Sequence, residues 1–363
     1  MKITSVESFH LDDNLAIVRV RTDDGHEGWG QTSPYHAELT VQVLHSIVAP
    51  FFIGRDPWDW EALVDELTRR SHKSYGTLFW RALCGVDTAV YDLLGKSVGR
   101  PVYQLLGGAV RTSIPVYGSS LRRDITPEDE AERLIALREE RGFRAFKIKV
   151  AEMMGRDTDP WLRRSSELVR VVRRELGPDV VLHADGNGGY SAPEAIRMGR
   201  LLEELDFGHF EEPCAWNELE STAEVARVLD IPVAGGEQDN VLEQFHRMIA
   251  MRAVDIVQPD IGYIGGMARA RKVVQMAEAA GMVATPHAAN QSLIQVFTLH
   301  LAASQPAISA FQEWNIEPFP WVDGVYGPMP EVIDGEVALT NAPGWGIEIL
   351  PEFLASARTE VTR

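Results

Sequence analysis

The alternation of apolar and polar positions divides the chain into a strand-rich start, a helical stretch and a long repeat of strand followed by helix. Residues 1–33 alternate as strands do, and Asp24-Gly25 marks a hairpin turn between two of them. Residues 36–105 change to helical spacing, which breaks near Gly99 and Pro101. This order predicts an α+β lobe at the N-terminal end.

From residue 113 onward, short apolar runs alternate with helical segments. The run at 114–120 predicts the first strand, Thr126 with Pro127 predicts the start of a helix, and Ser191 with Glu194 predicts a capping box. Strand signals return in the tail. We therefore expect an α/β fold in which an α+β capping domain (1–112) precedes a (β/α)8 TIM-type barrel (113–318), and a C-terminal segment (319–363) returns to the capping domain.

Ionisable side chains stand at the ends of the apolar runs. Along the chain these are Lys147 with Lys149, Asp185, Glu211, Glu237, Asp260, His287 and Glu313, at intervals of 23–36 residues. A strand, a loop and a helix need about that many residues, and a (β/α)8 barrel presents its chemistry at the C-terminal ends of its strands. The spacing therefore predicts one pocket that holds all of these groups.

Three carboxylates, Asp185, Glu211 and Glu237, end three consecutive strands. Three oxygen donors on one wall suit a hard divalent cation, above all Mg²⁺. The alternative is that each carboxylate caps a helix or pairs with an arginine. Asn187, two residues after Asp185, is expected to support the ligand or the substrate, although a turn asparagine is nearly as good an interpretation.

Lys147 and Lys149 share one face of the second barrel strand, because side chains alternate along a strand. A nearby divalent cation is expected to lower the pKa of each, so that one acts as a general base and the other balances substrate charge. Asp260 and His287 end neighbouring strands, so the carboxylate can orient the imidazole. Glu313 is expected to be a hydrogen-bond donor that keeps its proton.

Composition narrows the class of protein. The chain of 363 residues carries a net charge of −18, which argues against nucleic acid or an anionic membrane as partner. Two cysteines, no apolar leader and no apolar run of membrane-spanning length favour a cytoplasmic protein. A small carboxylate substrate stays compatible, because a bound cation inverts the local field.

The KxK, DxN, EEP, GGE, PD and PH motifs, in this order, resemble the enolase superfamily, mandelate racemase subgroup, over nearly the whole chain. The resemblance implies that Asp185, Glu211 and Glu237 bind Mg²⁺. It also implies that Lys149 is one general base and that His287 with Asp260 is the other, on opposite faces of the substrate. Lys147 and Glu313 would polarise the substrate carboxylate, and members are usually homo-oligomers.

Removal of a proton beside a carboxylate leads to more than one reaction. If an acid protonates a β-hydroxyl, water leaves and a 2-keto-3-deoxy acid forms; if the opposite base returns a proton, the carbon is racemised or epimerised. We favour dehydration of a sugar acid, an aldonate or aldarate, with a racemase or epimerase as the alternative. The link 12–14 is too short for the long apolar lid that a mandelate-like substrate implies in this family.

Polar residues around the predicted mouth are expected to contact the substrate. They are Ser119, Asn187, Asn290, Lys73 and Tyr75 of the segment 71–76, and Arg122 or its neighbour Arg123. Three other classes fit less well. A cycloisomerase of this family implies a lysine where Asp260 stands, a non-catalytic barrel implies lost ligands or bases, and a zinc hydrolase needs a histidine-rich ligand set.

Overall fold

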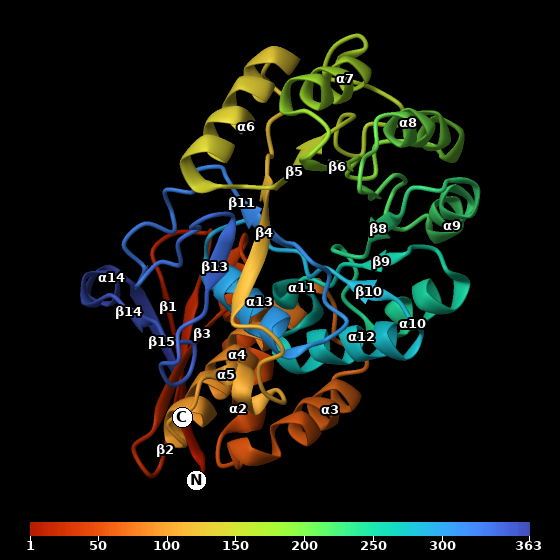
Figure 1. Ribbon diagram of the computed structural model, residues 1–363. Coiled ribbons are helices and arrows are strands. Elements are labelled where there is room, and N and C mark those ends of the chain that lie inside the picture. Colours follow the sequence, from red (N-terminus) through yellow and green to blue (C-terminus); the bar gives the residue numbers. More distant parts are fainter.

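Eight short parallel strands form the sheet of the larger lobe, in the order β10-β9-β8-β7-β6-β5-β4-β11 (Figure 1). A bridge between Ala284 and Ile308 joins the two ends of this order just before β11. The strands are β4 (Ser113–Ser119), β5 (Ala145–Lys149), β6 (Val181–Asp185), β7 (His209–Glu211), β8 (Val233–Gly235), β9 (Ile256–Val257), β10 (Val283–Ala284) and β11 (Gln312–Asn315). The computed structural model describes residues 1–363 and confirms the TIM-type barrel.

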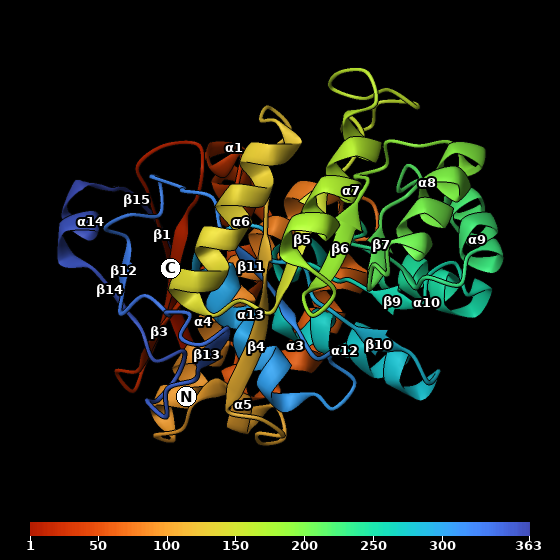
Figure 2. The same ribbon diagram turned by 45° about the horizontal axis from the view of Figure 1, so that its top comes forward.

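Helices cover the outside of this sheet (Figure 2). They are α6 (Pro127–Arg141), α7 (Arg164–Leu176), α8 (Ala192–Glu204), α9 (Leu219–Val228), α10 (Leu242–Met251), α11 (Ile261–Ile264), α12 (Met267–Ala279) and α13 (Leu293–Ser304). Apolar residues of both lobes belong to one continuous core, so the lobes pack as a unit.

The two predicted helix starts had different outcomes. Thr126 caps α6 as expected, because its hydroxyl accepts a hydrogen bond from the backbone N–H of Asp129 at 3.1 Å. The predicted capping box at Ser191 is wrong, since no side-chain cap forms at the start of α8. There the Glu194 carboxylate pairs with Arg197 and Asp157 accepts the Ser191 N–H, so Glu194 does not reach back to that N–H as a capping box requires.

The smaller lobe is a four-stranded antiparallel sheet backed by helices. The sheet has the order β15-β1-β2-β3, from β1 (Ile3–His10), β2 (Ile17–Thr22), β3 (Glu27–Gln31) and β15 (Arg358–Thr362). The helical elements are α1 (Ala37–Val43), a π-helical turn (Leu44–Val48), α2 (Ala49–Phe52), a 3-10 turn (Pro57–Asp59), α3 (Trp60–Arg70), α4 (Thr77–Ser97) and α5 (Val102–Leu105). The predicted turn between β2 and β3 contains Gly25 at φ 87°.

Helix α4 lies unusually close to β3 because two glycines leave room for its backbone. A Cβ on Gly28 would lie 2.2 Å from the carbonyl oxygen of Ala89, and one on Gly30 would lie 2.4 Å from the nitrogen of Ala89. Asp92 of α4 accepts the backbone N–H groups of Trp29 and Trp345, which ties β3, α4 and the tail together.

The tail contacts both lobes. It contains β12 (Tyr326–Gly327), β13 (Glu336–Ala338), β14 (Glu348–Ile349) and α14 (Pro351–Ser356) before β15. β13 pairs with β4 of the barrel, whereas β15 pairs with β1 of the smaller sheet. The division at 1–112, 113–318 and 319–363 stays a prediction.

The capping lobe packs on loops that follow the carboxyl ends of barrel strands. Thr77 accepts a hydrogen bond from Asn240 after β8, Arg81 lies 4.5 Å from the ring centre of Tyr263 after β9, and Gln31 donates to Ser292 after β10. This lobe therefore lies beside the mouth of the barrel. Taken singly, none of the helices has both the length and the apolar character needed to cross a membrane, although the segments 37–52 and 57–70 meet that test as a pair bent by 107°.

Candidate active site

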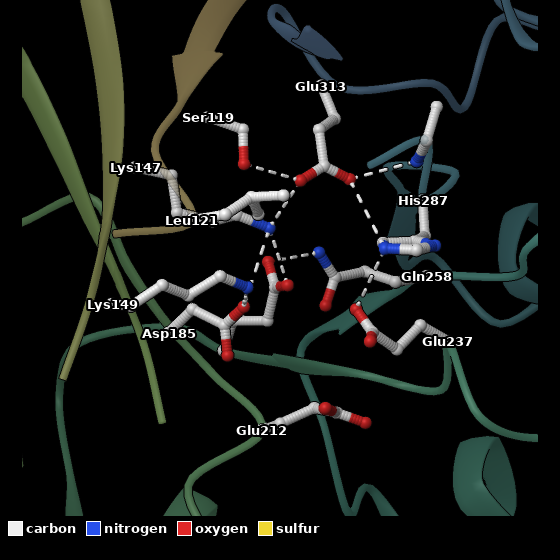
Figure 3. Close-up of polar contacts among 12 residues, drawn as sticks. Ser119, Leu121, Lys147, Lys149, Asp185, Glu212, Glu237, Gln258, His287 and Glu313 are labelled. Carbon is white, nitrogen blue, oxygen red and sulfur yellow. Dashed lines mark hydrogen bonds and ion pairs between the residues drawn. The ribbon is translucent and has the colours of Figure 1, made fainter. Parts of the chain in front are cut away.

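The ionisable residues at the strand ends converge on the barrel mouth. Figure 3 labels Lys147, Lys149, Asp185, Glu237, His287 and Glu313 there, Glu211 pairs with Lys147, and Asp260 pairs with His287. Lys149 pairs in register with Asp185, and Asp185 pairs with Glu211, so parallel pairing places these side chains beside one another. Figure 3 shows Lys149 and His287 on opposite sides of the group, with Glu212 outside it. β5 and β10 are well separated in the strand order, which agrees with that view.

The three carboxylates expected to bind a cation form one cluster. Asp185, Glu211 and Glu237 are buried, and each offers an oxygen that lies within 4.8 Å of the others. Burial, together with the charges of Glu211 and Asp185, raises the pKa of Glu237 to about 7, and its Oε2 has no hydrogen-bond partner. Like charges held this close, one with an oxygen whose only polar contact is His287 Nε2 at 3.4 Å, fit a Mg²⁺ site made of hard oxygen ligands.

Lys147 neutralises the inner side of this cluster. Its Nζ lies 2.6 Å from Glu211, 2.8 Å from Glu313 and 3.7 Å from Asp185, and the side chain is fully buried. We expected a lowered pKa for this lysine, but the structure differs. Burial alone would lower the pKa of Lys147, yet the surrounding carboxylates, Glu211 and Glu313 first, raise it well above its usual value. Lys147 is therefore a fixed cation and suits charge balance rather than proton abstraction.

Lys149 and His287 face each other from opposite sides of the carboxylate cluster. The Lys149 ammonium contacts Asp185 Oδ2. His287 Nδ1 lies 2.7 Å from Asp260 Oδ2, and its Nε2 lies 3.4 Å from Glu237. Burial lowers the pKa of His287, but Glu237, Glu313 and Asp260 outweigh it and raise that pKa to about 10. These surroundings favour an imidazolium that holds a proton on Nε2.

Glu313 differs from the expectation of a retained proton. Burial raises its pKa, but Lys147 and His287 lower it to about 2, so the side chain is a carboxylate. It accepts hydrogen bonds from Ser119 Oγ at 2.7 Å and from the backbone N–H of Ala288 at 2.9 Å. Two fixed donors and two cations hold Glu313 as an acceptor at the rim of the site.

The six expected substrate contacts divide into two groups. Ser119 and Asn187 lie at the cluster: Ser119 donates to Glu313, and Asn187 Nδ2 lies 3.3 Å from Asp185 Oδ2. Asn290 is buried and accepts the Ser292 N–H, but it makes no contact with the carboxylates. The structure brings no other expected contact to the carboxylates. Lys73 is exposed, Tyr75 packs on Trp80, and the side chain of Arg122 is 40% exposed and pairs with Asp124.

Two further side chains lie close to the cluster. Gln258 is fully buried and donates from Nε2 to Glu211 Oε2 at 2.7 Å. It stands two residues before Asp260, so strand alternation would have placed it on the same face. Arg123, which the sequence did not distinguish from Arg122, donates to Asn187 Oδ1 at 2.7 Å. No local sequence signal separates two adjacent arginines in a loop.

Comparisons with known proteins agree with this geometry. Residues 129–353 match the family model described as enolase C-terminal domain-like, and residues 2–107 match the mandelate racemase / muconate lactonizing enzyme N-terminal domain. The chain belongs to this family. The predicted resemblance to the enolase superfamily is thereby confirmed.

Three relatives illustrate the range of similar proteins. An arabinonate dehydratase from Saccharolobus solfataricus is 30% identical over 92% of this chain and 88% of its own. A protein from Roseobacter denitrificans, described only as a candidate racemase, is 48% identical with a TM-score of 0.98 over the full length of both chains. An L-talarate dehydratase from Polaromonas sp. JS666, solved with Mg and L-glucarate, is 28% identical with a TM-score of 0.85 over 99% of each chain.

Proposed function

We propose that this family member is a Mg²⁺-dependent enzyme that dehydrates a sugar acid to a 2-keto-3-deoxy acid. The observation that carries the proposal is the placement of Lys149 and His287 on opposite sides of the buried carboxylate cluster. Relatives named as an arabinonate dehydratase and an L-talarate dehydratase support the reaction class.

In the proposed mechanism, the substrate binds with its α-carbon between these two side chains. Lys149, as the free amine, removes the proton from that carbon. Mg²⁺ bound at Asp185, Glu211 and Glu237 would stabilise the negative charge that develops on the substrate carboxylate. Lys147 stabilises the same charge through its fixed ammonium, 2.6 Å from Glu211 and 2.8 Å from Glu313.

His287 completes the reaction from the other side. Its protonated Nε2 gives a proton to the β-hydroxyl, the carbon–oxygen bond breaks and water leaves. The enol that remains tautomerises to the 2-keto-3-deoxy acid. Asp260 holds the imidazole by the 2.7 Å contact to Nδ1, which keeps Nε2 directed toward the substrate space. If His287 instead returned a proton to the α-carbon, the same residues would make a racemase or epimerase, as the Roseobacter relative's description suggests.

The test separates the two proton transfers. A panel of aldonates and aldarates is assayed with Mg²⁺ in D₂O, with 2-keto acid formation and exchange of the α-proton as two readouts. We expect Lys149→Ala to lose both, and His287→Asn to lose keto acid formation while it keeps exchange. The exposed His246 gives a matched control, His246→Asn, which should behave as wild type.

Two other results would decide against dehydration. If no panel member yields keto acid and another acid shows α-proton exchange, the epimerase assignment replaces this proposal. If Lys149→Ala turns over at the wild-type rate, Lys149 is not the base.

A further inference from the structure

Arg123 is a cation at the barrel mouth whose hydrogen bonds all go to neutral groups. Its Nε donates to the backbone carbonyl of Ala151 at 2.9 Å, and Nη2 donates to the side-chain oxygen of Asn187 at 2.7 Å. Its Nη1 donates to no group of the protein, and this atom is accessible from outside the protein. The side chain is partly buried, which is an unusual position for a charge without an ionised partner.

The neighbouring arginine shows the ordinary arrangement. Arg122 forms an ion pair with Asp124, 2.6 Å from Nε, on an exposed part of the loop. No carboxylate lies within ion-pair distance of Arg123, and the charges of Asp185 and Glu152 act on it only from farther away. Asp185 is already engaged by Lys149. The guanidinium of Arg123 therefore has both a free donor and an unbalanced charge.

Arg123 also lies at a defined place relative to the reacting centre. Lys149 and Asn187 both approach the same oxygen, Asp185 Oδ2. Arg123 binds the other end of the Asn187 amide, so a single amide group separates its guanidinium from that oxygen. A substrate whose α-carbon lies against Lys149 can thus reach Arg123 with the far end of a chain of a few carbons.

We infer that Arg123 binds a second carboxylate at the far end of the substrate, and that the substrate is an aldarate rather than an aldonate. This inference rests on the proposed dehydration of a sugar acid. An arginine forms two parallel hydrogen bonds with a carboxylate and matches its planar shape. The terminal hydroxymethyl group of an aldonate carries no charge and leaves Arg123 unbalanced. The first carboxylate belongs at the metal cluster, beside Lys147 and the cation.

A purely structural role is the competing explanation. Arg123 joins Asn187 to the loop that follows β5 through Ala151, so it could serve only to hold these two segments. That role predicts equal losses for aldonates and aldarates when the arginine is replaced. Binding of a distal carboxylate predicts a loss for aldarates alone, expressed in KM rather than kcat.

The experiment compares hexarates with hexonates of the same configuration, which differ only at carbon 6. The wild-type enzyme with Mg²⁺ should prefer one hexarate over its matched hexonate by at least about tenfold in kcat/KM, the size expected for one charge-assisted hydrogen bond. Arg123→Gln should raise the KM for that hexarate by about 10- to 100-fold, and it should change kcat and the hexonate constants far less. Arg123→Lys should recover part of the loss. Arg156→Gln, an exposed arginine of the β5–α7 loop, is the matched control and should behave as wild type.

The outcomes separate this inference from the proposed function. A wild-type preference for the hexonate, or equal losses on both substrates in Arg123→Gln, overturns the inference and leaves dehydration intact. Absence of keto acid from every hexonate and hexarate overturns both. If Arg123→Gln does not fold, the matched substrates on the wild-type enzyme still decide the question.

Discussion

Gln258 is predicted to set the affinity of the carboxylate cluster for Mg²⁺. The two oxygens of Glu211 are held separately, Oε1 by Lys147 at 2.6 Å and Oε2 by Gln258 at 2.7 Å. Replacing Gln258 by leucine keeps the volume and removes only the second donor. The Glu211 carboxylate then keeps Lys147 at Oε1 and a longer, 3.5 Å contact with His209 Nε2 at Oε2, but it loses the short hydrogen bond that fixes Oε2.

The size of the effect follows from the type of hydrogen bond. A hydrogen bond to a charged group contributes about 1.5–3 kcal/mol. If all of that free energy is expressed in cation binding, the affinity falls by about 10- to 150-fold. Side chains that orient metal ligands show a similar range, about 10- to 100-fold in metal affinity. We therefore expect Gln258→Leu to raise the Kd for Mg²⁺ by one to two powers of ten, with kcat at saturating Mg²⁺ changed only a few-fold.

The assay is calorimetric titration of chelator-treated protein with Mg²⁺, together with the Mg²⁺ dependence of activity. Gln312→Leu is the control. Gln312 is also fully buried and also has an unpartnered Oε1, but its Nε2 donates to the backbone carbonyl of Phe311 at 3.0 Å. An unchanged Kd in Gln258→Leu, or an equal loss in Gln312→Leu, would refute the reasoning.

Three further predictions concern stability. Lys147→Met leaves Glu211 and Glu313 without their buried cation. The free energy of unfolding, measured with urea, should fall by about 3–5 kcal/mol in the presence of a chelator and by less when Mg²⁺ is present. An equal loss in both conditions would contradict this. Burial lowers the pKa of His300 from 6.5 to about 4, so between these values the unfolded chain binds more protons and stability falls as the pH falls. His300→Asn, whose Oδ1 can still accept the Tyr103 N–H, should flatten that slope by up to about 1.4 kcal/mol per pH unit, whereas parallel curves would exclude the assignment. Gly30→Ala places a Cβ 2.4 Å from the nitrogen of Ala89 and should cost about 1–3 kcal/mol or more, whereas Gly76→Ala meets nothing within 4 Å and should cost far less.

The placement of the residues at the strand ends was predictable because parallel pairing leaves little freedom in how neighbouring strands align. Once Asp185 and Glu211 are assigned to the ends of neighbouring parallel strands, pairing in register brings them together, and alternation puts Lys147 and Lys149 on one face. The same rule would have found Gln258. The barrel and the carboxylate cluster therefore follow from local pattern and from the geometry of a closed sheet.

Protonation and loop contacts were not predictable in this way. The pKa of Lys147 is raised and that of Glu313 is lowered because several charges from different strands act on each at once. A motif within one strand does not show which charges the other strands bring close. The sequence also did not distinguish Arg122 from Arg123. Their roles depend on where the chain turns after β4, which sends one side chain to Asp124 and the other to Asn187.

The charge balance of the site links the substrate class to Arg123. The carboxylates at the mouth are Asp185, Glu211, Glu237, Asp260 and Glu313, and the cationic groups among them are Lys147, Lys149 and His287. While Lys149 still holds its proton, before it acts as the base, five ionised carboxylates exceed three cations by two charges, and one divalent ion balances that excess. The group with its cation is then neutral, so a substrate carboxylate bound away from the cation needs a counter-charge from outside the group, and Arg123 is the nearby cation without an ion pair. Replacing Lys147 should therefore weaken the reaction of every substrate, whereas replacing Arg123 should weaken only the reactions of dicarboxylates.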